Sequence, residues 1–184
     1  HFYPMHSSIT IKLVAERTTG KVLGAQICGL GEAIKRVDVV ATILKFGGTL
    51  EDLSNIDLGY APPFSTAIDV LIHAANVLNN KRKGLVKAIT AQGLYQELSE
   101  DTPLCILDVR EEDEFTANPI KGEVVIKIPL GQLRERIAEV PKEEKLVTVC
   151  ELGIRGYEAA CLLNGAGYHA RYLEGGMSIW TAFY

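Results

Sequence analysis

The stretch "VTVCELGIRGYEAA", residues 147–160, places a cysteine where an apolar run ends and a helical pattern begins. In sheets of parallel strands, ligands bind at the carboxyl ends of the strands. Cys150 is expected to end such a strand, and the loop 151–155 leads into the next helix. Gly153 lets this loop curl, so that backbone N–H groups and a helix N-terminus favour the thiolate of Cys150. Arg155 is expected to add a positive charge at the rim of this site.

The residues on both sides of this stretch predict an α/β fold. Short apolar runs predict strands, and helical patterns lie between them. The expected strands are 87–90, 104–109, 123–128, 145–149 and 170–173. The expected helices are 91–100, 110–117, 131–140 and 155–167. Strands that alternate with helices predict a parallel sheet that is covered on both faces.

The first half of the chain has a different pattern, which predicts an α+β unit. Two alternating runs joined by "TTG" predict an antiparallel hairpin, and the segment 31–46 predicts a helix that ends at Gly47. Thr49 and Asp52 form a capping-box pattern, the prolines of "YAPPFS" (60–65) exclude helix, and a further helix follows. The helix over 31–46 carries an apolar stripe of Ile34, Val37, Ala41 and Leu44. We therefore expect a first domain over 1–80, a linker over 81–85 and a second domain over 86–184.

Composition excludes several classes of protein. The chain has 184 residues, 47% of them hydrophobic, and a net charge of −4 with a pI of about 5.6, which does not favour nucleic acid or an anionic membrane as a partner. No apolar run approaches the roughly 18–20 residues of a membrane-spanning helix. The four cysteines form no C-x-x-C pair, so no metal site is expected, and free thiols favour a cytoplasmic protein. The chain does not begin with Met, so we expect a fragment of a longer protein.

The second half resembles a rhodanese domain, a single-domain sulfurtransferase. The motifs that carry the resemblance are "ILDVREEDEF" (106–115), "CELGIRGYEAA" (150–160) and "YLEGGMSIW" (172–180). The resemblance implies that Cys150 carries a persulfide. It also implies that the loop Glu151, Leu152, Gly153, Ile154 and Arg155 holds this sulfur, with Asp108 and Arg110 as structural supports of the loop.

Two details of the loop bear on the substrate. Phosphatases of the same fold have a loop one residue longer, whereas four residues separate Cys150 from Arg155 here, which favours sulfur over phosphate. Glu151 directly follows the cysteine and opposes an anion site, which argues against small dianions such as thiosulfate as donors. The usual Gly-His-Ile of the family reads Asn118-Pro119-Ile120, so no histidine is available there.

Residues 1–80 resemble the C-terminal interface domain of the pyridine nucleotide-disulfide oxidoreductases, and more narrowly the branch of coenzyme A-disulfide reductases. The matching segments are "FYP", "TIKLV", "GKVLGAQICG", "KRVDVVATIL" and "LGYAPPFS". Glutathione-reductase-like relatives have a His-Glu pair in this region, where Tyr60 stands here. The resemblance implies that Tyr60 reaches the partner's flavin site across a homodimer and donates a hydrogen bond to a leaving sulfur. Tyr3 is a second candidate, and His73 is expected to be an ordinary core or surface residue.

The function expected from these features is that of a reductase fragment. The chain has no G-x-G-x-x-G after a strand, so FAD and NADH are expected to bind other parts of a parent protein. That parent would reduce coenzyme A (CoA) disulfide, CoA persulfide or polysulfide, with sulfane sulfur carried on Cys150. Two alternatives stay open: a stand-alone dimeric thiosulfate or persulfide sulfurtransferase, and a dimerising scaffold without catalytic activity.

Overall fold

The computed structural model describes residues 7–63, 65–100, 103–120, 124–142 and 145–183. The chain divides into two compact units, residues 1–84 and 85–184. Helix α3 (Val70–Arg82) belongs to the first unit, so the first two residues of the expected linker 81–85 form the end of a helix. Within the described residues, no helix is both long and apolar enough to cross a membrane.

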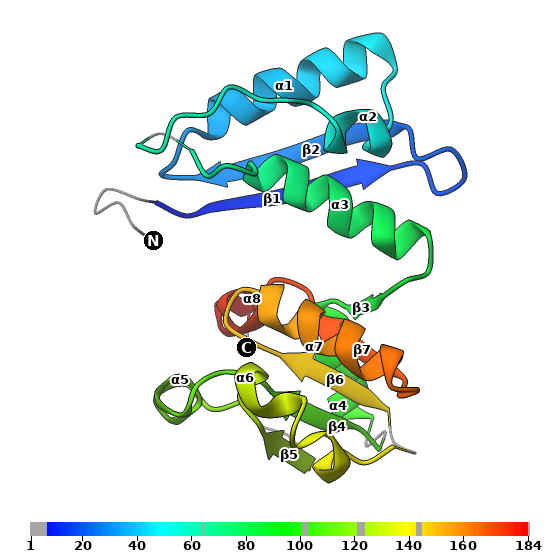
Figure 1. Ribbon diagram of the computed structural model, residues 1–184, viewed down its shortest axis with the longest axis vertical. Helices are drawn as coiled ribbons and strands as arrows, with labels where there is room; N and C mark the ends of the chain where they lie inside the picture. Colours follow the sequence, from blue (N-terminus) through cyan, green and yellow to red (C-terminus); the bar gives the residue numbers. More distant parts are fainter. Residues whose placement is uncertain (1–6, 64, 101–102, 121–123, 143–144, 184) are drawn as a thin grey trace. The chain divides into compact units, whose positions relative to one another are not determined.

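The first unit is an antiparallel hairpin covered by helices (Figure 1). Strand β1 (Ile9–Ala15) pairs with β2 (Val22–Gly29), while α1 (Ala33–Phe46) packs against β2 and α3 packs against β1. The short helix α2 (Leu50–Ser54) contacts α3. The residues that form the core of the unit are Val22, Val40, Ile43, Leu50, Leu53, Leu71 and Ala75.

Local sequence signals explain how α1 ends and α2 begins. Gly47 adopts φ 68°, a left-handed conformation that glycine allows, and its N–H closes the last turn of α1. The Thr49 hydroxyl accepts a hydrogen bond from the Asp52 N–H, and the Asp52 carboxylate accepts one from the Thr49 N–H. The expected helix stop and capping box are therefore both present in the structure.

The second unit is a parallel sheet of five strands in the order β3-β7-β6-β4-β5. The strands are β3 (Lys87–Ile89), β4 (Cys105–Asp108), β5 (Val124–Lys127), β6 (Leu146–Val149) and β7 (Ala170–Leu173). All pairs are parallel, and the register sets Asp108 of β4 beside Val149 of β6. The α/β class expected for this half is confirmed.

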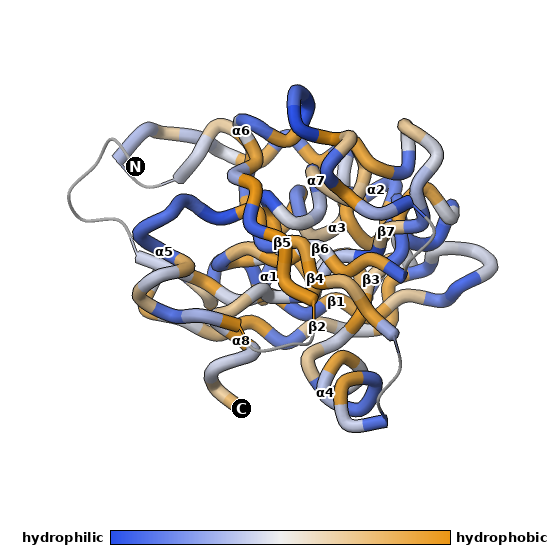
Figure 2. The backbone as a smooth tube through the Cα atoms, turned by 90° about the horizontal axis from the view of Figure 1, so that it is seen from below, coloured by the Kyte–Doolittle hydropathy of each residue, from blue (hydrophilic) through white to orange (hydrophobic). Residues whose placement is uncertain are grey.

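Helices cover both faces of this sheet, as expected for strands that are apolar along their length. Figure 2 shows the hydrophobic colour along β4 and β6, whose residues are all buried. Helix α7 (Ile154–Gly165) packs on β6 and β7, while α4 (Ala91–Ser99) and α8 (Gly176–Phe183) share the core cluster on the other face. That cluster includes Leu94, Ile106, Val147, Leu173 and Met177.

Two helical segments differ from the sequence expectation. The helix expected over 131–140 is divided into α6 (Leu130–Leu133) and a 3₁₀ turn, Ile137–Glu139. Val140 is extended because Pro141 follows it, and the residue before a proline is pushed out of the helical region. Helix α8 lies in a segment for which no helix was expected.

Candidate functional site

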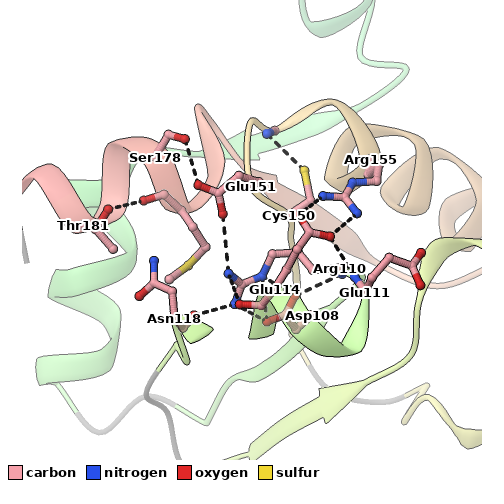
Figure 3. Close-up of polar contacts among 12 residues, drawn as sticks. Asp108, Arg110, Glu111, Glu114, Asn118, Cys150, Glu151, Arg155, Ser178 and Thr181 are labelled. Carbon is pink, nitrogen blue, oxygen red and sulfur yellow. Dashed lines mark hydrogen bonds and ion pairs between the residues drawn. The ribbon is translucent and has the colours of Figure 1, made fainter. Parts of the chain in front are cut away.

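Neighbouring strand ends build the candidate site. Strands β4 and β6 lie side by side and end at the same edge, where the Val109 N–H donates to the Val149 carbonyl over 2.9 Å. Cys150 is the first residue after β6, and Arg110 follows closely after β4 (Figure 3). The turn after β7, the other neighbour of β6, leads into α8. Helix α5 (Glu112–Ala117) follows the turn after β4.

The Cys150 side chain lies inside the curl of its loop. Cys150 is only 1% exposed, and its Sγ accepts a hydrogen bond of 3.1 Å from the Gly153 N–H. Gly153 has φ 92° and stands at the N-cap of α7, so the loop needs a residue without a side chain there. A Cβ at Gly153 would also lie 3.1 Å from the Gly175 nitrogen. The arrangement presents a backbone donor and a helix N-terminus to one sulfur atom.

The first turn of α8 holds the start of this loop. The Met177 N–H donates to the Cys150 carbonyl over 2.9 Å, and the Ser178 N–H donates to the Glu151 carbonyl over 3.0 Å. Gly176 has φ 58°, and a Cβ there would lie 2.2 Å from the Cys150 carbonyl oxygen. Gly176, directly before these donors, therefore permits the close approach of α8 to the loop.

Asp108 and Arg110 form a buried ion pair beneath the loop. Arg110 is 0% exposed, and its Nη2 lies 2.7 Å from Asp108 Oδ2. The same guanidinium donates to the carbonyl of Asn118 over 2.8 Å, which holds the end of α5. Removing one member of a buried ion pair typically costs about 3–5 kcal/mol, because the other charge stays buried without its partner. This geometry is consistent with the expected role of both residues as supports.

Arg155 makes a contact that the sequence expectation did not include. Its Nη1 and Nη2 donate to the two carboxylate oxygens of Glu114 over 2.7 and 2.5 Å. The hydrogen bond from Arg155 lowers the pKa of Glu114 from 4.5 to about 2. The positive charge expected at the rim is therefore present, but a carboxylate from α5 compensates it.

Glu151 is also paired. Its Oε2 lies 3.5 Å from Arg110 Nη1, and its Oε1 accepts a hydrogen bond of 3.1 Å from the Ser178 hydroxyl (Figure 3). The side chain is 40% exposed, so it stands at the surface of the site rather than in its interior. On each side of Gly153, Leu152 and Ile154 are 59% and 64% exposed.

The structure thus brings together the residues expected in the second unit, and it adds two that sequence reasoning missed. Glu114 and Ser178 orient Arg155 and Glu151 across 41 and 27 residues of chain. The only sequence signal for Glu114 is its place three residues after Glu111, where it completes a capping box at the start of α5.

Tyr60 belongs to the first unit and lies in the loop between α2 and α3, with 52% of its surface exposed. A buried ion pair anchors the end of this loop: Arg36 Nη2 lies 2.7 Å from Asp69 Oδ2, and Asp69 caps α3. The Ser65 hydroxyl donates to the same carboxylate over 3.3 Å. Tyr3, the second candidate tyrosine, lies outside the described residues.

Two turns of the second unit differ from the glycine-rich turn of dinucleotide-binding domains. The turn after β6 reads Cys-Glu-Leu-Gly-Ile-Arg, and the turn after β4 reads Val-Arg-Glu, so neither provides the glycine-rich turn that binds a dinucleotide. Among the described side chains, no group of three His, Cys, Asp or Glu residues is placed to hold a metal.

Comparisons with known proteins match both units. A model of the rhodanese-like domain matches residues 90–183, and a model of the pyridine nucleotide-disulphide oxidoreductase dimerisation domain matches residues 1–72. A putative sulfurtransferase of Bacillus subtilis, YtwF, is 28% identical over 95 residues, which are 52% of this chain and 90% of that protein. An NAD(P)H coenzyme A polysulfide/persulfide reductase of Pyrococcus horikoshii is 40% identical over 78 residues, 42% of this chain.

Two solved structures are similar to almost the whole chain. The reduced CoADR-RHD of Bacillus anthracis has a TM-score of 0.90 and 35% identity over 97% of this chain. An NAD-dependent persulfide reductase from A. fulgidus has a TM-score of 0.87 and 43% identity over 98% of it. The chain spans 31% of each of these two proteins and 17% of the Pyrococcus reductase. Residues 1–72 match the pyridine nucleotide-disulphide oxidoreductase dimerisation domain, and through residues 90–183 the chain belongs to the rhodanese-like family.

Proposed function

We propose that this chain is the C-terminal portion of a flavin- and NAD(P)H-dependent reductase of CoA disulfide, CoA persulfide or polysulfide. In this proposal its rhodanese domain carries sulfane sulfur on Cys150. The observation that carries the proposal is the hydrogen bond from the Gly153 N–H to Cys150 Sγ, in a loop held by α8. Similarity to two reductase structures over nearly the whole chain supports the same reading.

The chemistry at Cys150 is a transfer of one sulfur atom. The thiolate attacks the outer sulfur of a persulfide R–S–SH, so that a new S–S bond forms on Cys150. The S–S bond of the donor breaks, and its electron pair leaves on the inner sulfur as R–S⁻. The proton stays with the transferred sulfur, which gives Cys150–S–SH. Backbone donors such as the Gly153 N–H would stabilise this terminal sulfur in its anionic form.

The remaining parts of the reaction belong outside these residues. FAD and NAD(P)H would bind other domains of the parent protein, because the described turns do not fit a dinucleotide. The first unit would form a homodimer, and Tyr60 would serve the partner's flavin site. The second candidate function is that of a stand-alone sulfurtransferase. It is supported by the similarity of this chain to the putative sulfurtransferase YtwF, which extends over 90% of that protein.

The test measures persulfide formation in the wild-type chain and in variants in which one cysteine is replaced by serine. After incubation with a sulfane-sulfur donor, the 184-residue chain should gain the mass of one sulfur atom on the peptide that contains Cys150. Cys150→Ser should abolish this gain. Cys161→Ser, a half-buried cysteine of α7, is the matched control and should not change it. Sulfur bound equally by Cys150→Ser would contradict the proposal.

A second measurement separates the two candidates. In the full-length parent, Cys150→Ser should leave NAD(P)H-dependent reduction of CoA disulfide unchanged while it lowers turnover of persulfide or polysulfide. A stand-alone sulfurtransferase would show no NAD(P)H-dependent turnover at all. Equal loss of both reductions in a folded Cys150→Ser variant would mean that the two domains share one chemical step.

A further inference from the structure

Both guanidinium groups at the Cys150 loop already have a carboxylate partner. Arg155 contacts both oxygens of Glu114, and Arg110 contacts Asp108 at 2.7 Å. The Glu151 carboxylate shares Arg110 with Asp108 at the longer distance of 3.5 Å. These five side chains carry three negative charges and two positive charges. Glu151 therefore adds a surplus negative charge at the outer side of the loop.

Glu151 is held in this place rather than free to turn away. The Ser178 hydroxyl donates to its carboxylate over 3.1 Å, and the Ser178 N–H donates to its carbonyl over 3.0 Å. Its side chain is 40% exposed, so an incoming donor meets this charge in water-accessible surroundings. The carboxylate of Glu151 therefore repels a sulfur donor with two negative charges as it approaches Cys150.

The same loop exposes two apolar side chains. Leu152 and Ile154 flank the buried Gly153 in the chain and are 59% and 64% exposed. The Gly153 N–H donates a hydrogen bond to the sulfur of Cys150. A sulfur-donor molecule that reaches Cys150 therefore comes close to Gly153, whose neighbours in the chain are Leu152 and Ile154. Apolar surface beside a buried thiol suits a donor whose sulfur is attached to a carbon chain.

We propose that Glu151, Leu152 and Ile154 determine the donor specificity of Cys150, favouring an organic persulfide whose sulfur is attached to an uncharged carbon chain over the dianion thiosulfate. Glu151 disfavours the dianion by charge, and the carbon chain of the organic donor lies against Leu152 and Ile154. Backbone donors then hold the single transferred sulfur. This inference rests on the proposed role of Cys150 as a sulfur carrier.

The alkyl persulfide and thiosulfate each transfer one sulfur atom to Cys150, so their rates can be compared directly. Attack on an alkyl persulfide, R–S–SH, releases R–S⁻ and leaves Cys150–S–SH. Attack on the outer sulfur of thiosulfate breaks its S–S bond and releases sulfite, which takes the bonding electron pair and both negative charges of the donor. The product, Cys150–S–S⁻, keeps the charge of the attacking thiolate. The donors differ in the charge and shape of the group that leaves.

The charge is tested with Glu151→Gln, which keeps an oxygen for the Ser178 hydroxyl and removes the charge. The rate constant of Cys150 persulfidation by thiosulfate should rise about tenfold, while the rate with an alkyl persulfide should stay within about twofold. The gain should shrink as salt is added, because screening acts on charge and not on loop structure. Glu158→Gln, the same change at an exposed position of α7, is the control and should leave both rates unchanged.

The apolar part is tested with the double variant Leu152→Ser and Ile154→Ser. It should slow persulfidation by the alkyl persulfide about fivefold and leave the thiosulfate rate within about twofold. Leu85→Ser is the matched control, because Leu85 is another leucine of this unit and is 63% exposed. Thermal unfolding of each variant should show that the domain stays folded.

The outcomes separate this inference from the proposed function. If wild-type Cys150 accepts sulfur but Glu151→Gln changes both donors equally or neither, the specificity proposal is wrong and the carrier role stands. A gain with thiosulfate that does not respond to salt also overturns the proposal, because it would report a structural effect. If wild-type Cys150 accepts sulfur from neither donor, the carrier role itself fails.

Discussion

Arg155 and Glu114 join the two helices that flank the Cys150 loop. Arg155 stands in the first turn of α7, directly after the loop, and Glu114 stands in α5, which follows β4. Their two contacts of 2.7 and 2.5 Å have the bidentate geometry that makes arginine–carboxylate pairs strong and directional. The pair therefore fixes the side of the loop opposite to the contacts from α8.

This pair predicts a pH-dependent stability. The pKa of Glu114 is lowered from 4.5 to about 2, so its stabilising effect is fully present above about 4.5 and is lost as the pH falls toward 2. Glu114→Gln should lower the free energy of unfolding at neutral pH by about 1 kcal/mol, since both side chains are partly exposed. The difference between wild type and variant should disappear near pH 2. Urea unfolding at a series of pH values measures it.

Glu139→Gln is the control for this experiment. Glu139 also pairs with an arginine, Arg136, at 2.7 Å, but the two side chains are 52% and 38% exposed. Exposed pairs of this kind contribute little, so the free energy of unfolding should change less with Glu139→Gln than with Glu114→Gln. A larger effect of Glu139→Gln than of Glu114→Gln would show that the geometry at the loop carries no special stability.

A second prediction concerns the glycine that lets α8 approach Cys150. Gly176→Ala introduces a Cβ that would lie 2.2 Å from the Cys150 carbonyl oxygen, at a φ of 58° that alanine disfavours. The substitution should lower the free energy of unfolding by at least about 2 kcal/mol. It should also slow persulfide formation in the folded fraction, because the loop must shift. Denaturation and the persulfidation assay measure the two effects.

Gly165→Ala provides the opposite case within the same unit. Gly165 ends α7, and a Cβ there would meet nothing within 4 Å. This change should raise the free energy of unfolding by about 0.5 kcal/mol, because alanine restricts the unfolded chain. If both glycine variants behave alike, the close contact at Gly176 is not what holds the loop.

Most of the fold could be predicted from local sequence patterns. Strands β4 and β6 are buried at every position because helices cover both faces, which distinguishes them from β1, where exposed and half-buried residues alternate. The expected helices differ from the structure near Pro141 and near Gly176, since proline and glycine are each compatible with more than one local structure. Helix α8 was not expected, because it begins at Gly176, directly after Gly175, and both glycines have a positive φ.

The candidate site was predictable only in part, for a physical reason. The position of Cys150 follows from local features, namely a strand end, a glycine and a helix start. The partners of its loop do not, because Glu114 and Ser178 reach Arg155 and Glu151 through the order of the strands. Charge was misjudged for the same reason: a sequence shows that Arg155 is positive but not that a carboxylate 41 residues away compensates it.

A third prediction tests whether Tyr60 and Cys150 act separately. In the 184-residue chain, Tyr60→Phe should leave Cys150 persulfidation within about twofold, because the two residues belong to different units. In the full-length parent it should lower NAD(P)H-dependent turnover by about a hundredfold, the usual contribution of one positioned proton donor. Tyr95→Phe, with 49% exposure against 52% for Tyr60, is the control. Unchanged turnover in the parent would remove Tyr60 from the reductase site.

The outer face of α1 leads to the last prediction. The core face of this helix consists of Arg36, Val40 and Ile43, whereas the stripe singled out from the sequence points outward. Exposed apolar side chains gather on and beside the helix, with exposed fractions of 97% for Leu30, 77% for Ile34, 44% for Val37, 39% for Leu44 and 83% for Phe46. So many exposed apolar side chains on so small a unit are typical of a surface that another protein covers.

We expect this surface to be covered by a second copy of the chain, in agreement with the dimerisation-domain match over residues 1–72. Light scattering at micromolar concentration should give twice the chain mass of 20.1 kDa. Ile34→Glu should shift the protein toward the monomer, because it places a charge in the apolar contact. Lys35→Glu, at the next exposed position of α1, is the control and should leave the dimer intact. Equal masses for wild type and Ile34→Glu would exclude this face of α1 as the interface, since an unpaired buried carboxylate cannot be neutral to association.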